Sequence, residues 1–391
     1  MTPRSVVVVG ASLAGLSTAR ALRREGFSGP VTIVGEEPWL PYDRPPLSKA
    51  YLQGAVDRAS LDLVQPEEDL ELRWRLGVPA VSLDRSAGAV CLADGTQVRG
   101  DAVVVATGAA ARTLPGAADL DGLHTLRTVD DAEALRRRLQ PGARLVVVGA
   151  GFIGVEVAST AASLGVAVTV VEPQPVPLAA AVGPRLGAVL AARYARHGVT
   201  LLAGVGVSGV AGHGGRVAGV SLSDERFVAA DVVLIGIGAR PVVDWLAGSG
   251  VDLCDGVRCD AAMRSSVPGV FAVGDCARPH HGWTGRPTRL EHWTAAIDQP
   301  SIAVSAMLRP DAPETGYRTV PYFWSDQFGS RLQFAGHLRG GERIRTVHGD
   351  LDAEAAGDPL VAVYEREGEP VAVLAIDRPR DFGAWRRRLV P

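Results

Sequence analysis

The feature of this sequence that most constrains its fold is a pattern that occurs twice. Residues 6–36 and residues 145–172 each read as an apolar strand, a glycine-containing turn, a helix, a second apolar strand and an acid. The acid follows the first glycine by 26 residues in the first copy and by 23 in the second, from Gly10 to Glu36 and from Gly149 to Glu172. This is the order of the dinucleotide-binding βαβ unit, so we expect the chain to bind two dinucleotides.

Each glycine of such a turn has its own task. The first permits the tight turn, the second lets the backbone approach a pyrophosphate, and the third lets the helix pack closely on the strand. The helix N-terminus faces the phosphates, and the acid accepts hydrogen bonds from a ribose diol. The second copy has all three, Gly149, Gly151 and Gly154, whereas the first has Ser12 in the middle position. Because serine is small, we expect an altered pyrophosphate contact and not a lost site.

Two dinucleotides in one chain suggest a flavin and a nicotinamide cofactor. Apolar runs at 101–108 and 231–238 read as the strands that leave each dinucleotide domain, and from about residue 322 short strands with polar turns indicate a smaller α+β domain. We therefore predict an α/β fold with two Rossmann-like domains and a C-terminal α+β domain. The expected bounds are 1–112 and 237–311 for the FAD-binding domain, 113–236 for the NAD-binding domain, and 312–391 for the C-terminal domain.

Composition excludes several classes of function. The formal net charge is −3, with 21% charged residues, so no electrostatic pull toward nucleic acid or membrane is expected. No apolar run approaches the ~20 residues that span a bilayer, and no signal-peptide pattern precedes the first strand, so we expect a cytoplasmic protein. The four cysteines are too few for a disulfide scaffold, and the eight histidines lack metal-ligand spacing, so no metal site is predicted.

Lys49 is the one lysine among the 40 lysines and arginines, and the chain has no asparagine. Both shortages fit a GC-rich genome, because Lys and Asn share A-rich codons. The lysine ends the segment Pro41-Tyr42-Asp43-Arg44-Pro45-Pro46-Leu47-Ser48-Lys49. Either an ammonium is needed where a guanidinium does not fit, or the lysine is a chance survivor on a solvated loop. The residue alone leaves both interpretations open.

Five stretches carry a resemblance to a known family: residues 40–49, 149–156, 269–277, 291–293 and 321–327. Through them, and over essentially the whole chain, the sequence resembles the FAD-dependent ferredoxin reductases of oxygenase systems, of the putidaredoxin, biphenyl-dioxygenase and rubredoxin reductase type. Apoptosis-inducing factor is a more distant relative. The resemblance implies a glutathione-reductase-like fold and an NADH:ferredoxin oxidoreductase of the EC 1.18.1 type. In that family FAD accepts a hydride from NADH and passes single electrons to a small iron–sulfur ferredoxin.

The resemblance also implies the partners and the central residues. The ferredoxin would carry a [2Fe-2S] or [3Fe-4S] cluster and serve a cytochrome P450 or a ring-hydroxylating oxygenase. Lys49 would lie beside flavin N5 and pair with Glu156 on the NAD-domain helix, and these two are the predicted catalytic residues. Asp275 would bond the ribityl chain, and Trp293 would lie near the isoalloxazine at the start of a helix from about residue 291 to 308. The alternatives are an exposed Glu156 and ordinary core packing for Trp293 and Trp324.

The motifs and the resemblance together predict the cofactor-binding residues, which are Gly10, Ser12, Ala14, Gly15, Glu36, Arg44, Lys49, Val81, Ala106, Thr107, Gly108, Arg127, Gly149, Gly151, Phe152, Ile153, Gly154, Glu172, Gly238, Gly274, Asp275, Glu291, His292, Trp293 and Trp324. Among them, the resemblance implies that FAD would be held by Gly10, Ala14, Gly15, Glu36, Arg44, Lys49, Val81, Arg127 and Asp275. NADH would bind through Gly149, Gly151, Gly154 and Glu172. NADH is favoured over NADPH, because Glu172 would repel a 2′-phosphate and the next arginine along the chain is Arg185.

The cysteines argue against a thiol mechanism. Disulfide reductases of this architecture need a nucleophilic cysteine close to flavin, and residues 38–60 contain none. We expect Cys254 and Cys259 to be structural, so electrons would leave the flavin directly, which favours an iron–sulfur partner. Arginines are dense at 339–345 and 378–388, either as a surface for an acidic ferredoxin or as a solvated face. Alternative functions are an NADH oxidase, a quinone or rubredoxin reductase, or a non-catalytic NADH-responsive flavoprotein.

Overall fold

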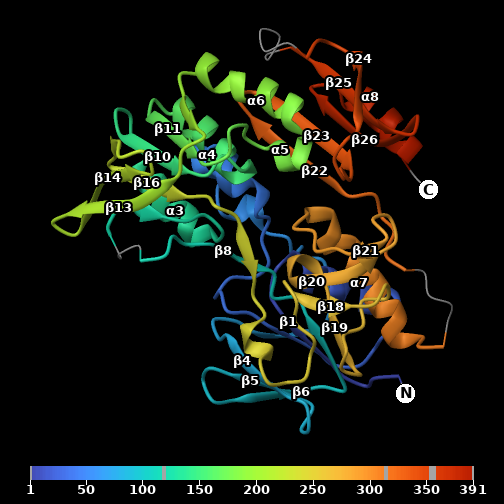
Figure 1. Ribbon diagram of the computed structural model, residues 1–391. Coiled ribbons are helices and arrows are strands. Elements are labelled where there is room, and N and C mark those ends of the chain that lie inside the picture. Colours follow the sequence, from blue (N-terminus) through green and yellow to red (C-terminus); the bar gives the residue numbers. More distant parts are fainter. Residues whose placement is uncertain (1, 117–119, 312–315, 352–357, 390–391) are drawn as a thin grey trace. The chain divides into compact units, whose positions relative to one another are not determined.

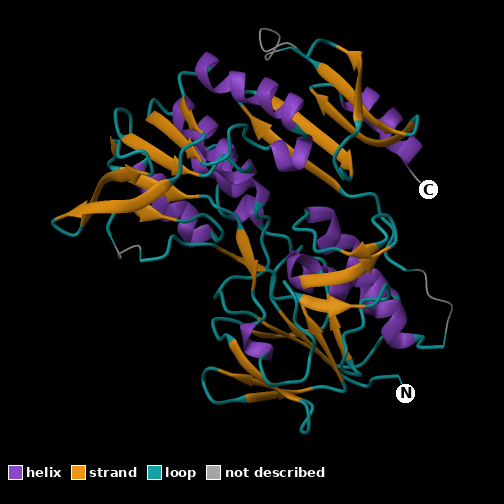
Figure 2. Cartoon of the chain, viewed as in Figure 1, coloured by secondary structure: helices purple, strands orange, loops and turns teal. Residues whose placement is uncertain are grey.

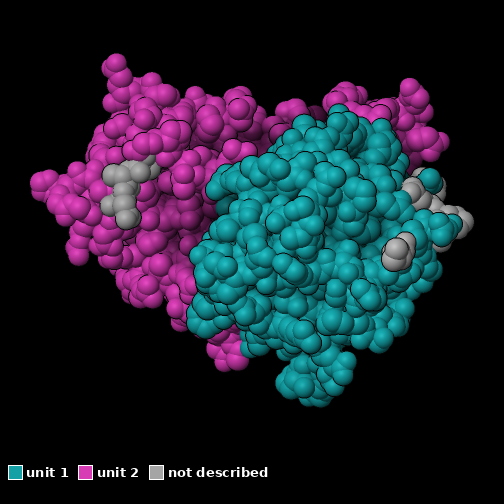
Figure 3. Space-filling model, turned by 90° about the horizontal axis from the view of Figure 1, so that it is seen from below, with its two compact units in different colours: residues 1–43, 61–110, 240–321 teal, residues 44–60, 111–239, 322–391 magenta. Residues whose placement is uncertain are grey.

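A computed structural model describes residues 2–116, 120–311, 316–351 and 358–389 (Figures 1 and 2). The chain forms two compact units, which Figure 3 shows in different colours. Unit 1 comprises residues 1–43, 61–110 and 240–321, and unit 2 comprises residues 44–60, 111–239 and 322–391. One passage of the chain from unit 1 to unit 2 lies within β8 (Ala109–Ala111), and one return lies within β17 (Ala239–Pro241).

Unit 1 is built on a parallel five-stranded sheet in the order β19-β7-β1-β2-β3. Its strands are β1 (Val6–Val9), β2 (Val31–Val34), β3 (Leu72–Arg75), β7 (Ala102–Val105) and β19 (Val270–Ala272). Val6 and Val8 pack in one core with side chains of α1 (Leu13–Arg24) and α7 (Trp293–Leu308). Val7 and Val9 belong to a second core. Because both faces of the sheet are buried, its inner strands are continuous apolar runs.

Smaller elements complete unit 1. An antiparallel meander supplies Leu83 and Val90 to the second core, and its strands are β4 (Ala80–Asp84), β5 (Ala89–Leu92) and β6 (Gln97–Arg99). A further sheet contains β18 (Val257–Cys259), β20 (Ala277–His281) and β21 (Arg286–Pro287). Its short 3₁₀ helices are η3 (Asp244–Leu246) and η4 (Gly274–Cys276), and η2 (Ala59–Leu61) lies where the chain returns from unit 2 to unit 1 after Ser60. Helix α7 begins at Trp293, two residues later than predicted, because His292 has an extended backbone.

Unit 2 contains the second parallel sheet, in the order β12-β11-β10-β16-β9. Its strands are β9 (Leu123–His124), β10 (Arg144–Val148), β11 (Ala167–Glu172), β12 (Thr200–Ala203) and β16 (Val232–Ile235). An antiparallel meander shares a core with β10, β11 and β16, and it comprises β13 (Val207–His213), β14 (Arg216–Leu222) and β15 (Phe227–Ala229). Helix α4 (Phe152–Ser163) follows the glycine turn, and α3 (Val129–Arg138) begins at a capping box of Thr128 and Asp131.

The last part of unit 2 is an antiparallel sheet in the order β22-β23-β26-β25-β24, accompanied by α8 (Pro379–Arg386) and η6 (Arg387–Leu389). Its strands are β22 (Tyr322–Gln327), β23 (Ser330–Gly336), β24 (Arg343–His348), β25 (Leu360–Arg366) and β26 (Glu369–Ile376). Helices α5 (Ala179–Val182) and α6 (Pro184–Arg196) share a core with this sheet. Phe328 and Gly329 join β22 to β23 with φ of +52° and +73°, as a type I′ hairpin turn requires.

The predicted fold class is confirmed, with two βαβ units at the predicted places and a C-terminal α+β part. Residues 44–60 form η1 (Pro45–Ser48) and α2 (Ala50–Gln53) and belong to unit 2. The predicted boundary at 311/312 borders residues 312–315, which lie outside the described residues. Within the described ranges, no helix is both long and apolar enough to cross a membrane.

Candidate functional site

The first glycine turn brings several predicted FAD residues together in unit 1. A Cβ on Gly10, whose φ is +125°, would lie 2.0 Å from Ala106 O, and one on Gly15 would lie 1.9 Å from Gly10 O. A Cβ on Gly274 would lie 2.9 Å from the Cβ of Ala14. Only glycine fits at the first two places, because a side chain there would overlap backbone atoms. The ends of β1 and β7, the start of α1 and the segment after β19 therefore meet at one edge of the sheet.

The remaining predicted residues of this edge differ in exposure. Ser12 is the N-cap of α1 with an extended backbone, and Glu36 is exposed after β2. Thr107 donates its hydroxyl to Val242 O at 2.5 Å, and Gly108 O accepts from the Val242 amide at 3.0 Å. This pair of bonds fixes the backbone that follows β7.

The N-terminus of α7 presents an exposed indole. Trp293 is its first residue and is 38% exposed, so it is not a core residue, and its Nε1–H donates to Asp43 Oδ1 at 3.1 Å. Burial lowers the pKa of His292 to about 4, although the charge of Asp275 opposes this shift. His292 is therefore neutral at pH 7. The preceding Glu291 is exposed and accepts from Arg289 at 2.5 Å.

The predicted catalytic pair is formed in unit 2. Lys49 Nζ lies 2.6 Å from Glu156 Oε2 and donates to Pro45 O at 3.0 Å. The side chain of Lys49 is 19% exposed and that of Glu156 is 6% exposed. Ser48 donates to the same Oε2 at 2.5 Å, and Ser325 donates to Oε1 at 2.7 Å. Lys49 is therefore not on a solvated loop, and Glu156 is not an exposed helix residue.

The two serines on this carboxylate were not among the predicted site residues. Serine occurs throughout the chain, and nothing in its local sequence marks a hydroxyl that reaches a carboxylate 108 or 169 residues away. A signal was available only at Ser48, which directly precedes the lone lysine. Ser325 lies in residues 321–327, one of the stretches that carry the family resemblance, but the residue predicted there was its aromatic neighbour Trp324.

Other predicted residues of unit 2 lie near backbone atoms or rings. Arg44 Nη1 donates to Arg127 O at 2.7 Å, which joins two of the predicted FAD residues. Trp324 is half-buried on β22, with its ring 5.9 Å from that of Tyr322. The Tyr322 ring in turn lies under the Arg386 guanidinium at 4.5 Å.

The second glycine turn combines tight and open positions. A Cβ on Gly149 would lie 2.5 Å from Gly236 O, and one on Gly154 would lie 2.3 Å from Gly149 O. By contrast, a Cβ on Gly151 would have Gly236 O as its one near atom at 3.9 Å, and one on Gly238 would meet nothing described within 4 Å. The turn is therefore closed toward the protein and open at Gly151, where a pyrophosphate would approach.

Side chains on either side of this turn have defined partners. Ile153 is 43% exposed, and the Phe152 ring lies 4.6 Å from that of Phe323 on β22. Glu172 accepts from the Ala150 amide through Oε2 at 2.8 Å and from the Gln174 amide through Oε1 at 2.9 Å. The acid is thus fixed beside the turn by two backbone donors.

These features fit two dinucleotides. Both turns are too tight for any side chain at their first and third glycines, and Gly151 leaves its backbone accessible. Val81, Ile153 and Trp293 are large apolar side chains that are 50%, 43% and 38% exposed. Of these, Ile153 directly precedes Gly154, the third glycine of the second turn.

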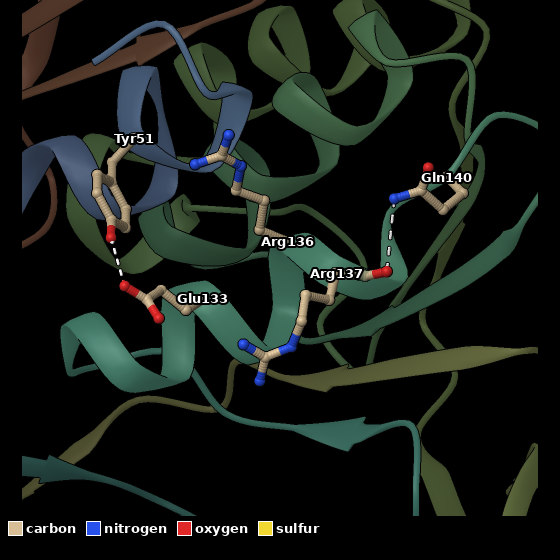
Figure 4. A pocket seen from close by; sticks show the side chains of 5 residues that line it. All are labelled: Tyr51, Glu133, Arg136, Arg137 and Gln140. Atoms are coloured by element: carbon tan, nitrogen blue, oxygen red, sulfur yellow. Dashed lines mark hydrogen bonds between the residues drawn. The ribbon is translucent and has the colours of Figure 1, made fainter. Parts of the chain in front are cut away.

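A separate hollow lies on the face of α3 (Figure 4). It encloses about 360 Å³ and is lined by Tyr51, Glu133, Arg136, Arg137 and Gln140. The Tyr51 hydroxyl donates to Glu133 at 2.8 Å, which links α2 to α3. None of these residues was predicted to bind a cofactor. The three that α3 contributes, Glu133, Arg136 and Arg137, are exposed.

All four cysteines are free thiols, and two of them are buried. Cys259 and Cys276 are buried in the second core of unit 1, and burial raises the pKa of both thiols. A thiol with a raised pKa stays protonated and is a poor nucleophile. Cys254 is exposed and accepts from Arg278 Nη1 at 2.9 Å, and Cys91 is half-buried on β5.

Comparison with known proteins agrees with this geometry. The family described as pyridine nucleotide-disulphide oxidoreductase matches residues 4–300, which is more than half of the chain. The chain belongs to this family. A second family, described as reductase C-terminal, matches residues 322–390. Membership of the pyridine nucleotide-disulphide oxidoreductase family implies FAD and NAD(P)H as cofactors.

Individual relatives cover nearly the whole chain. Rhodocoxin reductase of Rhodococcus erythropolis is 38% identical over 390 residues, which is 98% of this chain and 89% of the relative. The ferredoxin reductase component of chlorobenzene dioxygenase from a Cupriavidus species is 39% identical over 396 residues, with 98% and 92% covered. A chain in the crystal structure of the covalent putidaredoxin reductase–putidaredoxin complex superposes with a TM-score of 0.93 at 32% identity, with 99% and 93% covered. The predicted family is confirmed.

Proposed function

We propose that this family member is an NADH-dependent ferredoxin reductase. It takes electrons from NADH and passes them, through FAD, to a small iron–sulfur ferredoxin that serves a cytochrome P450 or a ring-hydroxylating oxygenase. The observation that carries this proposal is the likeness, along 98% of the chain, to reductases whose names state such a role. One is a rhodocoxin reductase, and another is the ferredoxin reductase component of a dioxygenase.

Bound FAD would supply the chemistry, because a flavin exchanges two electrons with a nicotinamide and single electrons with an iron–sulfur centre. The protein's task is then to bind and orient. Gly10, Ala14 and Gly15 would admit the FAD pyrophosphate at the start of α1, whose N-terminus favours negative charge. Lys49, held by Glu156, would place a fixed positive charge at the reacting side of the flavin. The remaining predicted residues would line the two cofactors as given above.

The three-domain division accompanies this proposal. An FAD-binding domain of residues 1–112 and 237–311 would be interrupted by an NAD-binding domain of residues 113–236. Residues 312–391 would form the third domain. Both glycine turns fall inside the domains to which they are assigned, and the reductase C-terminal family matches within the third.

NADH is the proposed physiological donor. Glu172 ends β11, and two backbone amides hold its carboxylate beside the glycine turn. A fixed carboxylate accepts hydrogen bonds from a ribose diol and repels a 2′-phosphate. The segment from Pro173 to Pro177 supplies no arginine that could receive that phosphate.

Direct transfer without a thiol relay is supported by the cysteines. Cys259 and Cys276 are buried with raised pKa values, and residues 38–60 contain no cysteine. A disulfide relay would need an accessible thiolate close to the flavin. Electrons are therefore expected to leave the flavin directly to the ferredoxin.

The test is NADH-dependent reduction of cytochrome c by the holoenzyme, with and without a small [2Fe-2S] or [3Fe-4S] ferredoxin from the same organism. A large increase in rate with ferredoxin is the expected result. Equal rates in both, together with fast reduction of oxygen or a quinone, would place the protein among oxidases or quinone reductases. Slow turnover with every acceptor would contradict a reductase role and favour a binding function.

A further inference from the structure

The Glu156 carboxylate is the meeting point of two segments far apart in the sequence. Its Oε2 accepts from Ser48 at 2.5 Å and from Lys49 at 2.6 Å, which lie at the end of η1 and directly after it. Its Oε1 accepts from Ser325 at 2.7 Å, on β22 of the C-terminal sheet. Glu156, Ser48 and Ser325 are 5%, 5% and 0% exposed. Three donors thus share one buried carboxylate, and one of them comes from the C-terminal sheet.

The same face of α4 fixes the backbone of both segments. Thr160, one turn after Glu156, donates its hydroxyl to Ser48 O at 2.8 Å. Ser159 Oγ accepts from the Phe328 amide at 2.7 Å, in the turn of the β22–β23 hairpin. Residues at i, i+3 and i+4 lie on one side of a helix, so Glu156, Ser159 and Thr160 act together.

The hairpin turn is held from a second helix as well. Arg193 on α6 is 2% exposed and donates to Phe328 O at 3.4 Å. The Phe328 ring stacks on His197 at 4.8 Å and meets Tyr194 edge-on at 5.4 Å. Because Phe328 is fixed on both its backbone and its ring, β22 has little freedom to move Ser325 away from Glu156.

The direction of the Ser325 hydroxyl is set by its neighbours. Gln327 lies two residues along β22, on the same face of the strand, and its Nε2 donates to Ser325 Oγ at 3.3 Å. A serine hydroxyl has one hydrogen to give, so while it accepts from Gln327 that hydrogen points to Glu156. Trp324 lies on the opposite face of β22.

We propose that Ser325 is a positioning residue for the Lys49–Glu156 pair, so that the C-terminal sheet helps to set how readily NADH reduces the bound flavin. This inference rests on the proposed function. Without Ser325, the buried Oε1 would lose its donor and the carboxylate could rotate about its Cγ–Cδ bond. The Lys49 ammonium would then be drawn from its place between Pro45 O and Glu156 Oε2.

The test compares Ser325→Ala with Ser325→Thr, which keeps a hydroxyl, and with Ser330→Ala, a matched removal of a hydroxyl on β23. Stopped-flow absorbance gives the limiting rate of flavin reduction and the apparent Kd for NADH. We expect Ser325→Ala to lower the limiting rate about fivefold, because one hydrogen bond to a charged group is lost, with little change in Kd. The midpoint potential of the bound flavin should become more negative. Ser325→Thr should restore part of both, and Ser330→Ala should match the wild type.

A double-mutant cycle with Glu156→Gln decides whether Ser325 acts through Glu156. When Ser325→Ala is added to the Glu156→Gln variant, it should have no further effect on the limiting rate or on the midpoint potential. Additive effects, or an unchanged rate and potential in Ser325→Ala, would overturn the proposal. The same cycle measured by urea unfolding of the cofactor-free chain should show coupling between the two residues. If NADH did not reduce the flavin bound to the wild-type protein, the proposed function would be contradicted. The unfolding cycle would then still measure the interaction between Ser325 and Glu156.

Discussion

Among single residues, Lys49 shows most directly how the surroundings of a side chain determine what it can do chemically. Its ammonium donates to a buried carboxylate and to a backbone carbonyl within 3.0 Å, and Ser48 donates to the same carboxylate oxygen. A guanidinium is broader and planar, so it cannot replace the ammonium beside Ser48 and Glu156 without moving the carboxylate.

Lys49→Met should slow reduction of the flavin by NADH by about tenfold or more, because the fixed positive charge is lost. FAD content after purification should change little. The free energy of unfolding should fall by about 2 kcal/mol, since Glu156 stays buried without its counter-ion. Stopped-flow absorbance measures the rate of flavin reduction, and urea unfolding measures the loss of stability. Lys49→Arg keeps the charge, and reduction by this variant at the wild-type rate would contradict the need for an ammonium.

Glu172→Gln should change the choice of nucleotide. The amide keeps the size of the side chain and one acceptor oxygen but removes the charge that repels a 2′-phosphate. We expect the ratio of kcat/KM for NADH to that for NADPH to fall about tenfold, which corresponds to about 1.4 kcal/mol. Glu369→Gln, an exposed acid at the start of β26, serves as the control. An unchanged ratio would show that Glu172 does not determine the preference for NADH over NADPH.

His292 should make stability depend on pH. Its folded pKa is about 4, below the ordinary 6.5, because burial disfavours the charged ring. The stability that this group contributes is therefore complete above pH 6.5 and is lost as the pH falls through 4, by about 3 kcal/mol at most. In the cofactor-free chain, His292→Gln should flatten the fall in unfolding free energy between pH 7 and pH 4. His280→Gln, at an exposed position, should leave the slope of the wild type.

At the level of elements, the apolar strands were predictable from the sequence, and a helix start or a turn without a local signal was less so. The strands β1, β2 and β25 begin where their apolar runs begin, because a strand buried on both faces must be continuously apolar. The start of α7 was predicted two residues early, since Glu291 and His292 carry no capping signal. In the β22–β23 turn Phe328 has a positive φ, and a phenylalanine in the sequence does not indicate this conformation.

Helix α3 offers an element with an explicit cap. Thr128 Oγ1 accepts from the Asp131 amide at 3.1 Å, and Asp131 accepts from the Thr128 amide at 3.0 Å. Thr128→Ala should lower the local stability of α3 by about 1 kcal/mol and make its first-turn amides exchange about fivefold faster. Hydrogen exchange monitored by mass spectrometry measures this, and Thr128→Ser should keep the wild-type rate. Equal exchange in the alanine variant would show that packing, not the cap, holds the first turn.

Across the whole molecule, the sequence was sufficient for the fold class and the family, because two βαβ units and a chain-long likeness are visible without coordinates. The Lys49–Glu156 pair was predicted through the resemblance. Its hydroxyl partners were not, since Ser48 and Ser325 reach Glu156 only after two segments far apart in the sequence have folded onto one helix. Long-range polar contacts of this kind leave no periodic trace in a sequence.

Attraction between the reductase and its ferredoxin is also a property of the whole molecule. Arg380, Arg387 and Arg388 are exposed on α8 and η6, and the ferredoxins of such systems are expected to be acidic. The double variant Arg380→Glu/Arg387→Glu should raise the KM for ferredoxin about tenfold, and the effect should shrink as salt is added. NADH-dependent reduction of ferricyanide should not change. Arg99→Glu on β6 of unit 1 is the control, and an equal effect there would indicate net charge and not this surface.

The lone lysine also has a spectroscopic consequence. Since Lys49 provides the one ε-ammonium of the chain, incorporation of ¹⁵N-lysine would place a single side-chain label in the protein, inside the Glu156 ion pair. One resonance could then be followed as FAD, NADH or a ferredoxin is added, with no assignment step and no background from other side chains. The chain thus carries an isotopic reporter at the centre of its candidate site without any change to its sequence.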